Sequence, residues 1–195
     1  EMRCVIKSAG MIMSLAMILG AAVFFANTGG AQERIYKIGE RGPGGGWIFY
    51  DKGNSDGGWR YLEAAPDELT TREGAEWGCY KKEIADAKGT AIGTGKSNTQ
   101  AILKSCGEAG VAARLCAEYR GGGKEDWFLP SRDELHLMYK NLHLKRIGDF
   151  NKVITFYWSS SEFNLDWARF ECLVIGDKRP HSKKHRYGVR AIRAF

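Results

Sequence analysis

The chain is organised around two apolar stretches, Phe-Tyr-Trp-Ser-Ser-Ser-Glu at residues 156–162 and Val-Arg-Ala-Ile-Arg-Ala-Phe at residues 189–195. Both are rich in aromatic and β-branched residues and contain no proline, which predicts strands. The residues between them differ, since 163–166 show no clear period and 177–188 are polar, basic and rich in turn formers. Two strands that enclose an irregular polar segment are typical of a rigid scaffold that presents a binding loop.

Composition favours one globular domain. The chain has 195 residues, of which 44% are hydrophobic, enough for a sizeable core. From Gly176 to the end, seven Lys or Arg residues face a single Asp. This basic C-terminal end indicates an anionic partner, such as a sulfated or sialylated glycan, a lipid head group or nucleic acid. The alternative is a solvated basic face without a partner.

The N-terminus has the layout of a secretory signal. Arg3 and Lys7 precede an apolar run over residues 9–25, and small residues follow up to Ala31. We expect cleavage before Gln32, with an uncleaved membrane anchor as the alternative. The predicted organisation is a signal peptide or anchor over 1–31 and a single ligand-binding domain over 32–195. Such a protein is exported and lies at the cell surface, in the periplasm or outside the cell.

Export makes disulfides possible. The mature chain holds Cys79, Cys106, Cys116 and Cys172, and four cysteines permit three full pairings. Cys106 with Cys116 is the first expectation, because the helix turn between them brings them close. No C-x-x-C pair occurs, so a zinc site is not expected.

Helices are predicted in the middle of the chain. Ser97 or Asn98 would cap a first helix that runs through Leu103, and a second helix covers 111–116 until the glycines at 121–123 stop it. Gly-Thr-Gly-Lys-Ser at 93–97 is not a phosphate-binding loop, because Thr90 stands where that motif needs a glycine. Short strands are expected at 35–38, 47–50 and 59–62.

A third helix is expected from Arg132 to His143. Ser131 and Glu134 form a capping box at its start. An apolar stripe then follows at helical spacing, formed by Leu135, Met138, Tyr139 and Leu142.

Six motifs occur in a fixed order: Gly-Pro-Gly-Gly-Gly-Trp-Ile-Phe-Tyr at 42–50, Leu-Glu-Ala-Ala-Pro at 62–66, Ile-Gly-Thr-Gly-Lys-Ser-Asn-Thr at 92–99, Asp-Trp-Phe-Leu-Pro-Ser-Arg-Asp-Glu-Leu at 126–135, Tyr-Trp-Ser-Ser-Ser-Glu at 157–162 and Val-Arg-Ala-Ile-Arg-Ala-Phe at 189–195. Together they cover nearly all of the mature chain. The chain thereby resembles the bacterial surface-protein domain at the C-terminus of the legionella collagen-like adhesin. The resemblance implies an α+β, C-type-lectin-like fold of the formylglycine-generating-enzyme subtype, with small twisted antiparallel sheets and two to three helices. It also implies an adhesin-like ligand binder.

Some proteins of this fold are variable proteins of diversity-generating retroelements, in which template Asn codons are randomised near the C-terminus. The randomised codons end in C, so they cannot encode Lys, Glu, Gln, Met or Trp. The corresponding positions here are 163–166, 179–182 and 184–187, and all but Lys184 hold a residue that such codons can encode. A reverse transcriptase gene beside a near-copy of codons 158–195 would identify such an element.

The segment between the two framing strands is therefore the expected ligand surface. Its aromatic and apolar residues would supply contact area and its cations charge and hydrogen-bond donors. The predicted ligand-binding residues are Phe163, Leu165, Asp166, Arg169, Phe170, Arg179, His181, Ser182, Lys183, His185, Arg186 and Tyr187. Tyr187→Ala and Arg186→Ala are expected to abolish binding with little change in thermal stability. The expected partner is a protein or glycan, anionic if the basic residues contact it, with no nucleic acid and no membrane contact beyond the N-terminal segment.

No catalytic residue, cofactor or metal site is predicted. Formylglycine-generating enzymes use two late cysteines, whereas only Cys172 lies late here. Ser159, Ser160 and Ser161 have no triad spacing to His136 or His143, and the calcium-dependent sugar motifs Glu-Pro-Asn, Gln-Pro-Asp and Trp-Asn-Asp do not occur. A structural envelope protein and, less favoured, an enzyme of the formylglycine-generating type are the alternatives.

The packing expectations are specific. The first mature strands and residues 189–195 should share one sheet. Trp47, Trp127 and Trp158 should be largely buried.

Overall fold

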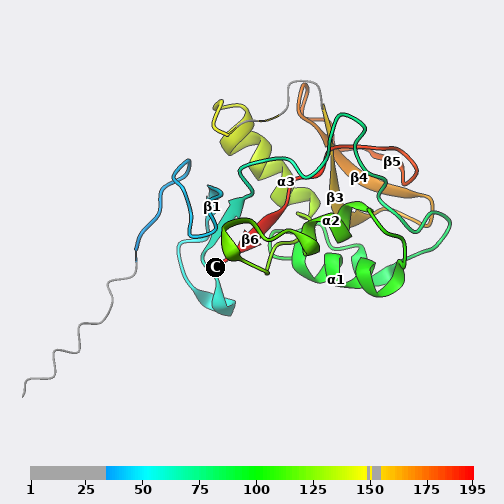
Figure 1. Ribbon diagram of the computed structural model, residues 1–195, viewed down its shortest axis with the longest axis horizontal. Helices are drawn as coiled ribbons and strands as arrows, with labels where there is room; N and C mark the ends of the chain where they lie inside the picture. Colours follow the sequence, from blue (N-terminus) through cyan, green and yellow to red (C-terminus); the bar gives the residue numbers. More distant parts are fainter. Residues whose placement is uncertain (1–33, 149, 151–154) are drawn as a thin grey trace, which may run out of the picture. The chain divides into compact units, whose positions relative to one another are not determined.

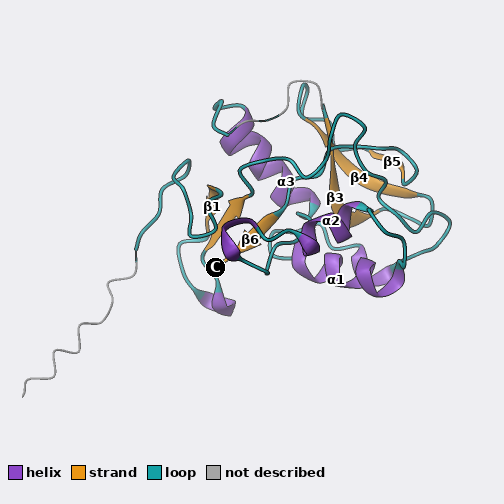
Figure 2. Ribbon diagram, viewed as in Figure 1, coloured by secondary structure: helices purple, strands orange, loops and turns teal. Residues whose placement is uncertain are grey.

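Residues 34–148, 150 and 155–195 are described by a computed structural model, and they combine helices with antiparallel sheets (Figures 1 and 2). The part from Ile35 to Phe195 forms one compact unit. The predicted signal or anchor at 1–31 and its cleavage point before Gln32 lie outside the described residues. Within the described ranges, no helix has the length and apolar character needed to cross a membrane.

The first sheet joins the two ends of the domain. Its strands are β1 (Trp47–Asp51), β2 (Tyr61–Ala64) and β6 (Ile192–Ala194), paired antiparallel in the order β1-β2-β6. This confirms that the first strands and the C-terminal stretch share a sheet. The C-terminal strand is shorter than predicted, because residues 189–191 run beside a loop instead, where Val189 and Ala191 accept hydrogen bonds from the amides of Leu69 and Ala65. Residues 35–38 form no strand.

The second sheet contains β3 (Phe156–Glu162), β4 (Trp167–Cys172) and β5 (Pro180–Ser182), antiparallel in the order β3-β4-β5. The prediction of β3 is confirmed. The expectation of one irregular segment after it is wrong, since β4 and β5 lie within that segment. The cause is visible at the start of β4, where buried Ala168 alternates with the exposed Trp167 and the half-buried Arg169, as a strand requires.

Three α-helices accompany these sheets in the described residues: α1 (Gly95–Ser105), α2 (Ala112–Glu118) and α3 (Arg132–Met138). A π-helical turn, Tyr139–His143, extends α3 to the predicted end. Short 3₁₀ turns occur at Asp56–Gly58, Ala85–Ala87 and Gly121–Gly123. In Figure 1, α3 lies between β1 on one side and β3 and β4 on the other, and it contacts all three strands.

The capping box at the start of α3 is confirmed. Ser131 Oγ accepts the amide of Glu134 at 3.4 Å, and Glu134 Oε2 accepts the amide of Ser131 at 2.7 Å. Glu134 Oε1 also accepts the amide of Gly93 at 2.8 Å, so its carboxylate lies at the start of α1. There is no room for a Cβ at Gly95, because it would collide with this carboxylate. Helix α1 therefore begins at Gly95, earlier than the predicted cap at Ser97 or Asn98.

The core confirms most of the packing expectations. The stripe of Leu135, Met138, Tyr139 and Leu142 is buried against both sheets. Trp127 and Trp158 are buried, whereas Trp47 is only partly buried. The Arg41 guanidinium lies 3.6 Å from the centre of the Trp47 ring and covers it from the solvent side.

A buried ionic cluster links four of the six sequence motifs. Arg193 Nη1 donates to Glu63 Oε1 at 3.0 Å, and Arg193 Nε donates to Asp126 Oδ1 at 2.7 Å. The amide of Gly44 donates to the same Glu63 oxygen at 2.8 Å, and a Cβ at Gly44 would collide with it. Gly42 and Gly44 are therefore required by the close approach of this backbone to a buried carboxylate.

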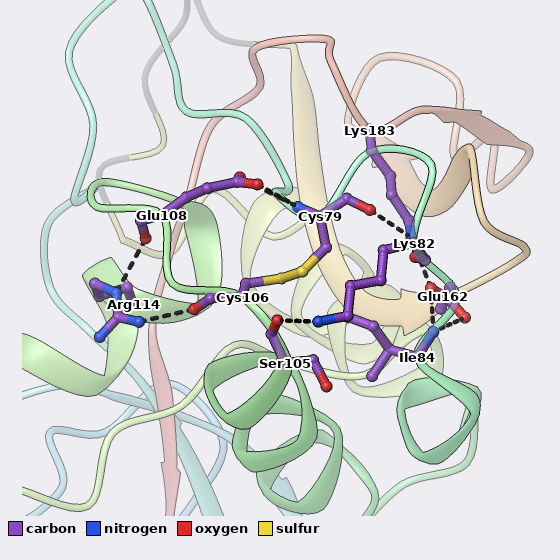
Figure 3. The surroundings of a disulfide bond; sticks show 9 residues. All are labelled: Cys79, Lys82, Ile84, Ser105, Cys106, Glu108, Arg114, Glu162 and Lys183. Carbon is purple, nitrogen blue, oxygen red and sulfur yellow. Dashed lines mark hydrogen bonds and ion pairs between the residues drawn. A yellow bond between two sulfur atoms is a disulfide. The ribbon is translucent and has the colours of Figure 1, made fainter.

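The disulfide joins Cys79 to Cys106, with their Cα atoms 5.5 Å apart (Figure 3). The predicted Cys106–Cys116 bond is wrong, because Cys116 faces the core from α2 and is a free, fully buried thiol. Burial raises the pKa of Cys116 well above its usual value. Cys79 instead reaches the end of α1 from a loop in which its own φ is 51°.

Loss of this disulfide is expected to lower the free energy of unfolding by about 3 kcal/mol, because it closes a loop across a sequence separation of 27. Urea unfolding of a Cys79→Ala/Cys106→Ala variant measures this effect. Reductant should destabilise the parent by a similar amount and leave the variant unchanged. A parent that is insensitive to reductant would contradict the bond.

Candidate functional site

The second sheet and its connecting turns enclose a hollow of about 530 Å³, called here the aromatic cleft. Strand β3 supplies one side chain to its wall, β4 supplies three and β5 supplies two, while the turns supply the rest. Its lining residues are Phe156, Trp167, Phe170, Cys172, Ile175, Asp177, Arg179, Pro180, His181 and Tyr187. Four of these were predicted as ligand-binding residues: Phe170, Arg179, His181 and Tyr187.

The rings of Phe170, His181 and Tyr187 form one wall of the aromatic cleft, and His185 stacks on His181 without lining the cleft. The His181 ring lies 3.9 Å from that of His185 and 5.8 Å from that of Tyr187, measured between centroids. The Phe170 ring lies 5.6 Å from His181. A wall of this kind offers flat faces to a ligand at little cost in side-chain entropy.

The polar atoms of His181 and Tyr187 are paired with each other in this wall. His181 Nδ1 is hydrogen-bonded to the Tyr187 hydroxyl. Burial raises the pKa of Tyr187 to about 12, so the phenol keeps its proton. Desolvation is the main cause that lowers the pKa of His181, and electrostatic interaction with His185 and Arg179 lowers it further. The wall is therefore apolar in character although it contains a histidine.

A second hollow of about 250 Å³, called here the arginine hollow, adjoins the aromatic cleft. It is lined by Arg72, Gly74, Thr155, Phe156, Arg186, Tyr187 and Gly188. Phe156 and Tyr187 line both hollows, and their ring centroids are 5.2 Å apart. The two rings therefore form a shared wall between an apolar compartment and a cationic one.

Arg186 is held in place at the edge of the arginine hollow. Its Nε donates to the carbonyl of Glu73 at 3.2 Å and its Nη2 to the carbonyl of Gly74 at 2.9 Å. Arg72 comes from the same loop and is exposed. Sequence reasoning missed Arg72 because nothing in its local pattern connects it with residues that follow more than eighty positions later.

Several predicted residues lie outside both hollows. Phe163 and Leu165 are exposed on the turn between β3 and β4, where the Arg169 guanidinium lies 5.1 Å from the centre of the Phe163 ring. The carbonyl of Asp166 accepts the amide of Lys183, and the carbonyl of Ser182 accepts the amide of His185. These residues shape the loops beside the cleft, but they do not line it.

Lys183 is not a ligand-binding residue. It is fully buried, and its Nζ lies 2.6 Å from Glu162 Oε1 and 2.8 Å from the carbonyl of Lys82 (Figure 3). The amide of Ile84 donates to the same carboxylate at 2.9 Å. The pair thus ties the loop after β5 to the end of β3 and to the loop that contains Cys79. Its role is structural.

Tyr187 has a double role that corrects the expectation for its alanine variant. Its amide donates to the carbonyl of Ala75 at 3.0 Å, and its ring lies 4.6 Å from that of Trp158 in the core. Tyr187→Ala would therefore weaken the fold as well as the cleft, so it cannot test binding alone. Phe170 is also largely buried.

The basic C-terminal end is less exposed than its composition indicates. Lys183, Arg190 and Arg193 are buried. Arg190 lies 3.7 Å from Glu68, and Arg193 contacts Glu63 and Asp126. The exposed cations near the two hollows are Arg72, Arg179, Lys184 and Arg186. Of these, Arg179 is paired with Asp177 at 2.6 Å.

The serines of β3 are engaged in the fold. Ser159 Oγ donates to the carbonyl of Arg169 at 2.9 Å, and Ser161 Oγ donates to that of Gly89 at 2.6 Å. His136 lies 3.0 Å from Glu171 and has no contact with these hydroxyls. In the described ranges, no group of three or more His, Cys, Asp or Glu side chains is arranged to hold a metal ion.

Comparison of the sequence with known proteins returns no matching family model and no matching curated protein. The function proposed below therefore rests on the chemistry of the two hollows.

Proposed function

We propose that this chain is an exported, adhesin-like ligand-binding protein, and that the aromatic cleft and the arginine hollow form its binding surface. The observation that carries the proposal is the aromatic cleft itself. A hollow of about 530 Å³ with mainly apolar walls and a few oriented polar groups has the size and lining of a ligand site. Export is proposed from the basic and apolar N-terminal segment.

A C-type-lectin-like scaffold is part of this proposal. It is supported by the small antiparallel sheets and by the pairing of the last strand, β6, with β2. The ionic cluster of Glu63, Asp126 and Arg193 adds support, because it brings residues from four separated sequence motifs into contact in one place.

Diversification of the surface is proposed for the same region. Positions 179–182 contain Arg179 and His181, and positions 184–187 contain Arg186 and Tyr187, all of which line a hollow. Variation there would change the ligand specificity directly. Positions 163–166 lie beside the hollows and would change only their surroundings.

The proposal is tested with a matched pair of exposed aliphatic residues. Ile175 is 71% exposed and lines the aromatic cleft, whereas Leu144 is 58% exposed and does not line it. We expect Ile175→Ser to reduce binding of the full chain to printed glycan and peptide arrays by about tenfold. Leu144→Ser should bind like the parent.

Both variants should keep the stability of the parent within about 0.5 kcal/mol, because both positions are on the surface. Trp167→Ser, at a second cleft position, should reproduce the loss of binding. If Ile175→Ser and Trp167→Ser both gave the parent's array signals, the aromatic cleft would not be the binding site.

A further inference from the structure

We infer that the partner of this surface is an acidic protein segment in which a large apolar side chain stands beside a carboxylate. The inference rests on the proposed function, since it names the partner of the same site. It follows from the contrast between the two hollows and from the wall that they share. A ligand that fills both must present apolar and anionic groups next to each other.

The aromatic cleft would take the apolar side chain. Its walls include the rings of Phe156, Trp167 and Phe170 and the side chain of Ile175. Its charged lining residues compensate each other, because Arg179 and Asp177 form an ion pair at 2.6 Å. A large apolar side chain that fills an apolar pocket of this kind is the usual centre of a protein interface.

The arginine hollow would take the carboxylate. Arg72 and Arg186 line it, and no acidic side chain is among the described residues of its wall. A guanidinium has five N–H donors in a plane, and the two carbonyls that fix Arg186 engage only its Nε and Nη2. The fixed guanidinium is thus oriented to meet a carboxylate, for which its geometry is well suited.

The surroundings favour a protein over a glycan. Exposed apolar side chains also occur in the turns before and after β4, at Phe163, Leu165 and Val174, in addition to the exposed cleft residues Trp167 and Ile175. Exposed aromatic and aliphatic side chains around an apolar cleft are typical of protein interfaces. A sugar would need polar groups for its hydroxyls, but Asp177, the one carboxylate among the described lining residues, is already held by Arg179.

The test is a selection of random twelve-residue peptides displayed on phage against the immobilised full chain. We expect the enriched peptides to carry Asp or Glu within three positions of Phe, Trp, Leu or Ile. A synthetic peptide of the enriched type and its Asp→Asn or Glu→Gln version are then titrated by fluorescence polarisation. The neutral version should bind about tenfold more weakly to the parent. It should bind about as well as the acidic version to an Arg72→Ser/Arg186→Ser variant.

Arg72→Ser alone provides the second variant, because it leaves the bonds of Arg186 to Glu73 and Gly74 intact. It should remove part of the preference for the acidic peptide without a change in melting temperature. The preference should also weaken as salt rises, since exposed charges are screened beyond about 8 Å at physiological ionic strength.

Failure of this inference differs from failure of the proposed function. Enriched peptides without an acidic residue, or a neutral peptide that binds the parent equally well, would overturn the acidic partner. Glycan binding that Ile175→Ser abolishes, without any peptide enrichment, would also overturn it. In these cases the cleft remains the binding site. Peptides that bind Ile175→Ser and the double arginine variant as well as the parent would overturn both.

Discussion

Lys183→Ala is expected to lower the free energy of unfolding by about 3–5 kcal/mol. The substitution leaves the Glu162 carboxylate fully buried without its cation, and it removes the donor to the carbonyl of Lys82. An uncompensated buried charge costs far more than the loss of an exposed ion pair. Urea unfolding followed by tryptophan fluorescence measures the change. Trp77 is a suitable probe because the Lys183 ammonium lies 4.7 Å from the centre of its ring.

The neighbouring lysine is the matched control. Lys184 is exposed, so Lys184→Ala should change the stability by less than about 0.5 kcal/mol. The two variants remove the same charge from adjacent positions. A difference in their stability therefore reports the burial of Lys183 and not the change in net charge. Equal stability of the two variants would show that Lys183 is solvated, as its sequence context indicates.

Trp158→Ala is expected to cost about 3–5 kcal/mol, as other large buried aromatics do. Trp158 is fully buried, and its Nε1 donates to the carbonyl of Ala75 at 2.9 Å. The substitution creates a cavity and also removes one of the two donors to that carbonyl, leaving only the Tyr187 amide. Because the Tyr187 ring rests on Trp158, the variant should lose the shared wall of the two hollows as well.

Trp167 provides the comparison within the same sheet. It is 42% exposed, so Trp167→Ala should cost less than about 1 kcal/mol. Chemical unfolding of both variants under the same conditions gives the difference. A loss below 1 kcal/mol for Trp158→Ala would contradict its burial.

The elements that could be predicted from the sequence are those set by neighbouring residues. Ser131 and Glu134 are three positions apart, so the start of α3 is a local signal. The apolar stripe that follows is local as well. The start of α1 was misplaced because it depends on the carboxylate of Glu134, about forty positions later. Strands β4 and β5 could not be predicted for a similar reason, since β4 is formed by pairing with β3 and β5 by pairing with β4.

The candidate site shows the same division. Phe170, Arg179, His181, Arg186 and Tyr187 could be predicted because they lie between the two stretches predicted as strands. Arg72 could not, since only the folded chain brings its loop to Arg186. The burial of Lys183 depends on Glu162, twenty-one positions earlier, while its sequence neighbours are all typical of a surface. The partner of Cys106 likewise follows from tertiary packing.

The buried anchor at Lys183 has a practical consequence for protein engineering. It pins the middle of the loop to the interior, while His181 and Ser182 before it and Lys184, His185 and Arg186 after it face outward or are only half-buried. A combinatorial library could therefore randomise these five positions and keep Lys183 constant. Each variant would keep the same attachment of the loop to Glu162, so the variants would differ in their binding surface and share the anchored backbone.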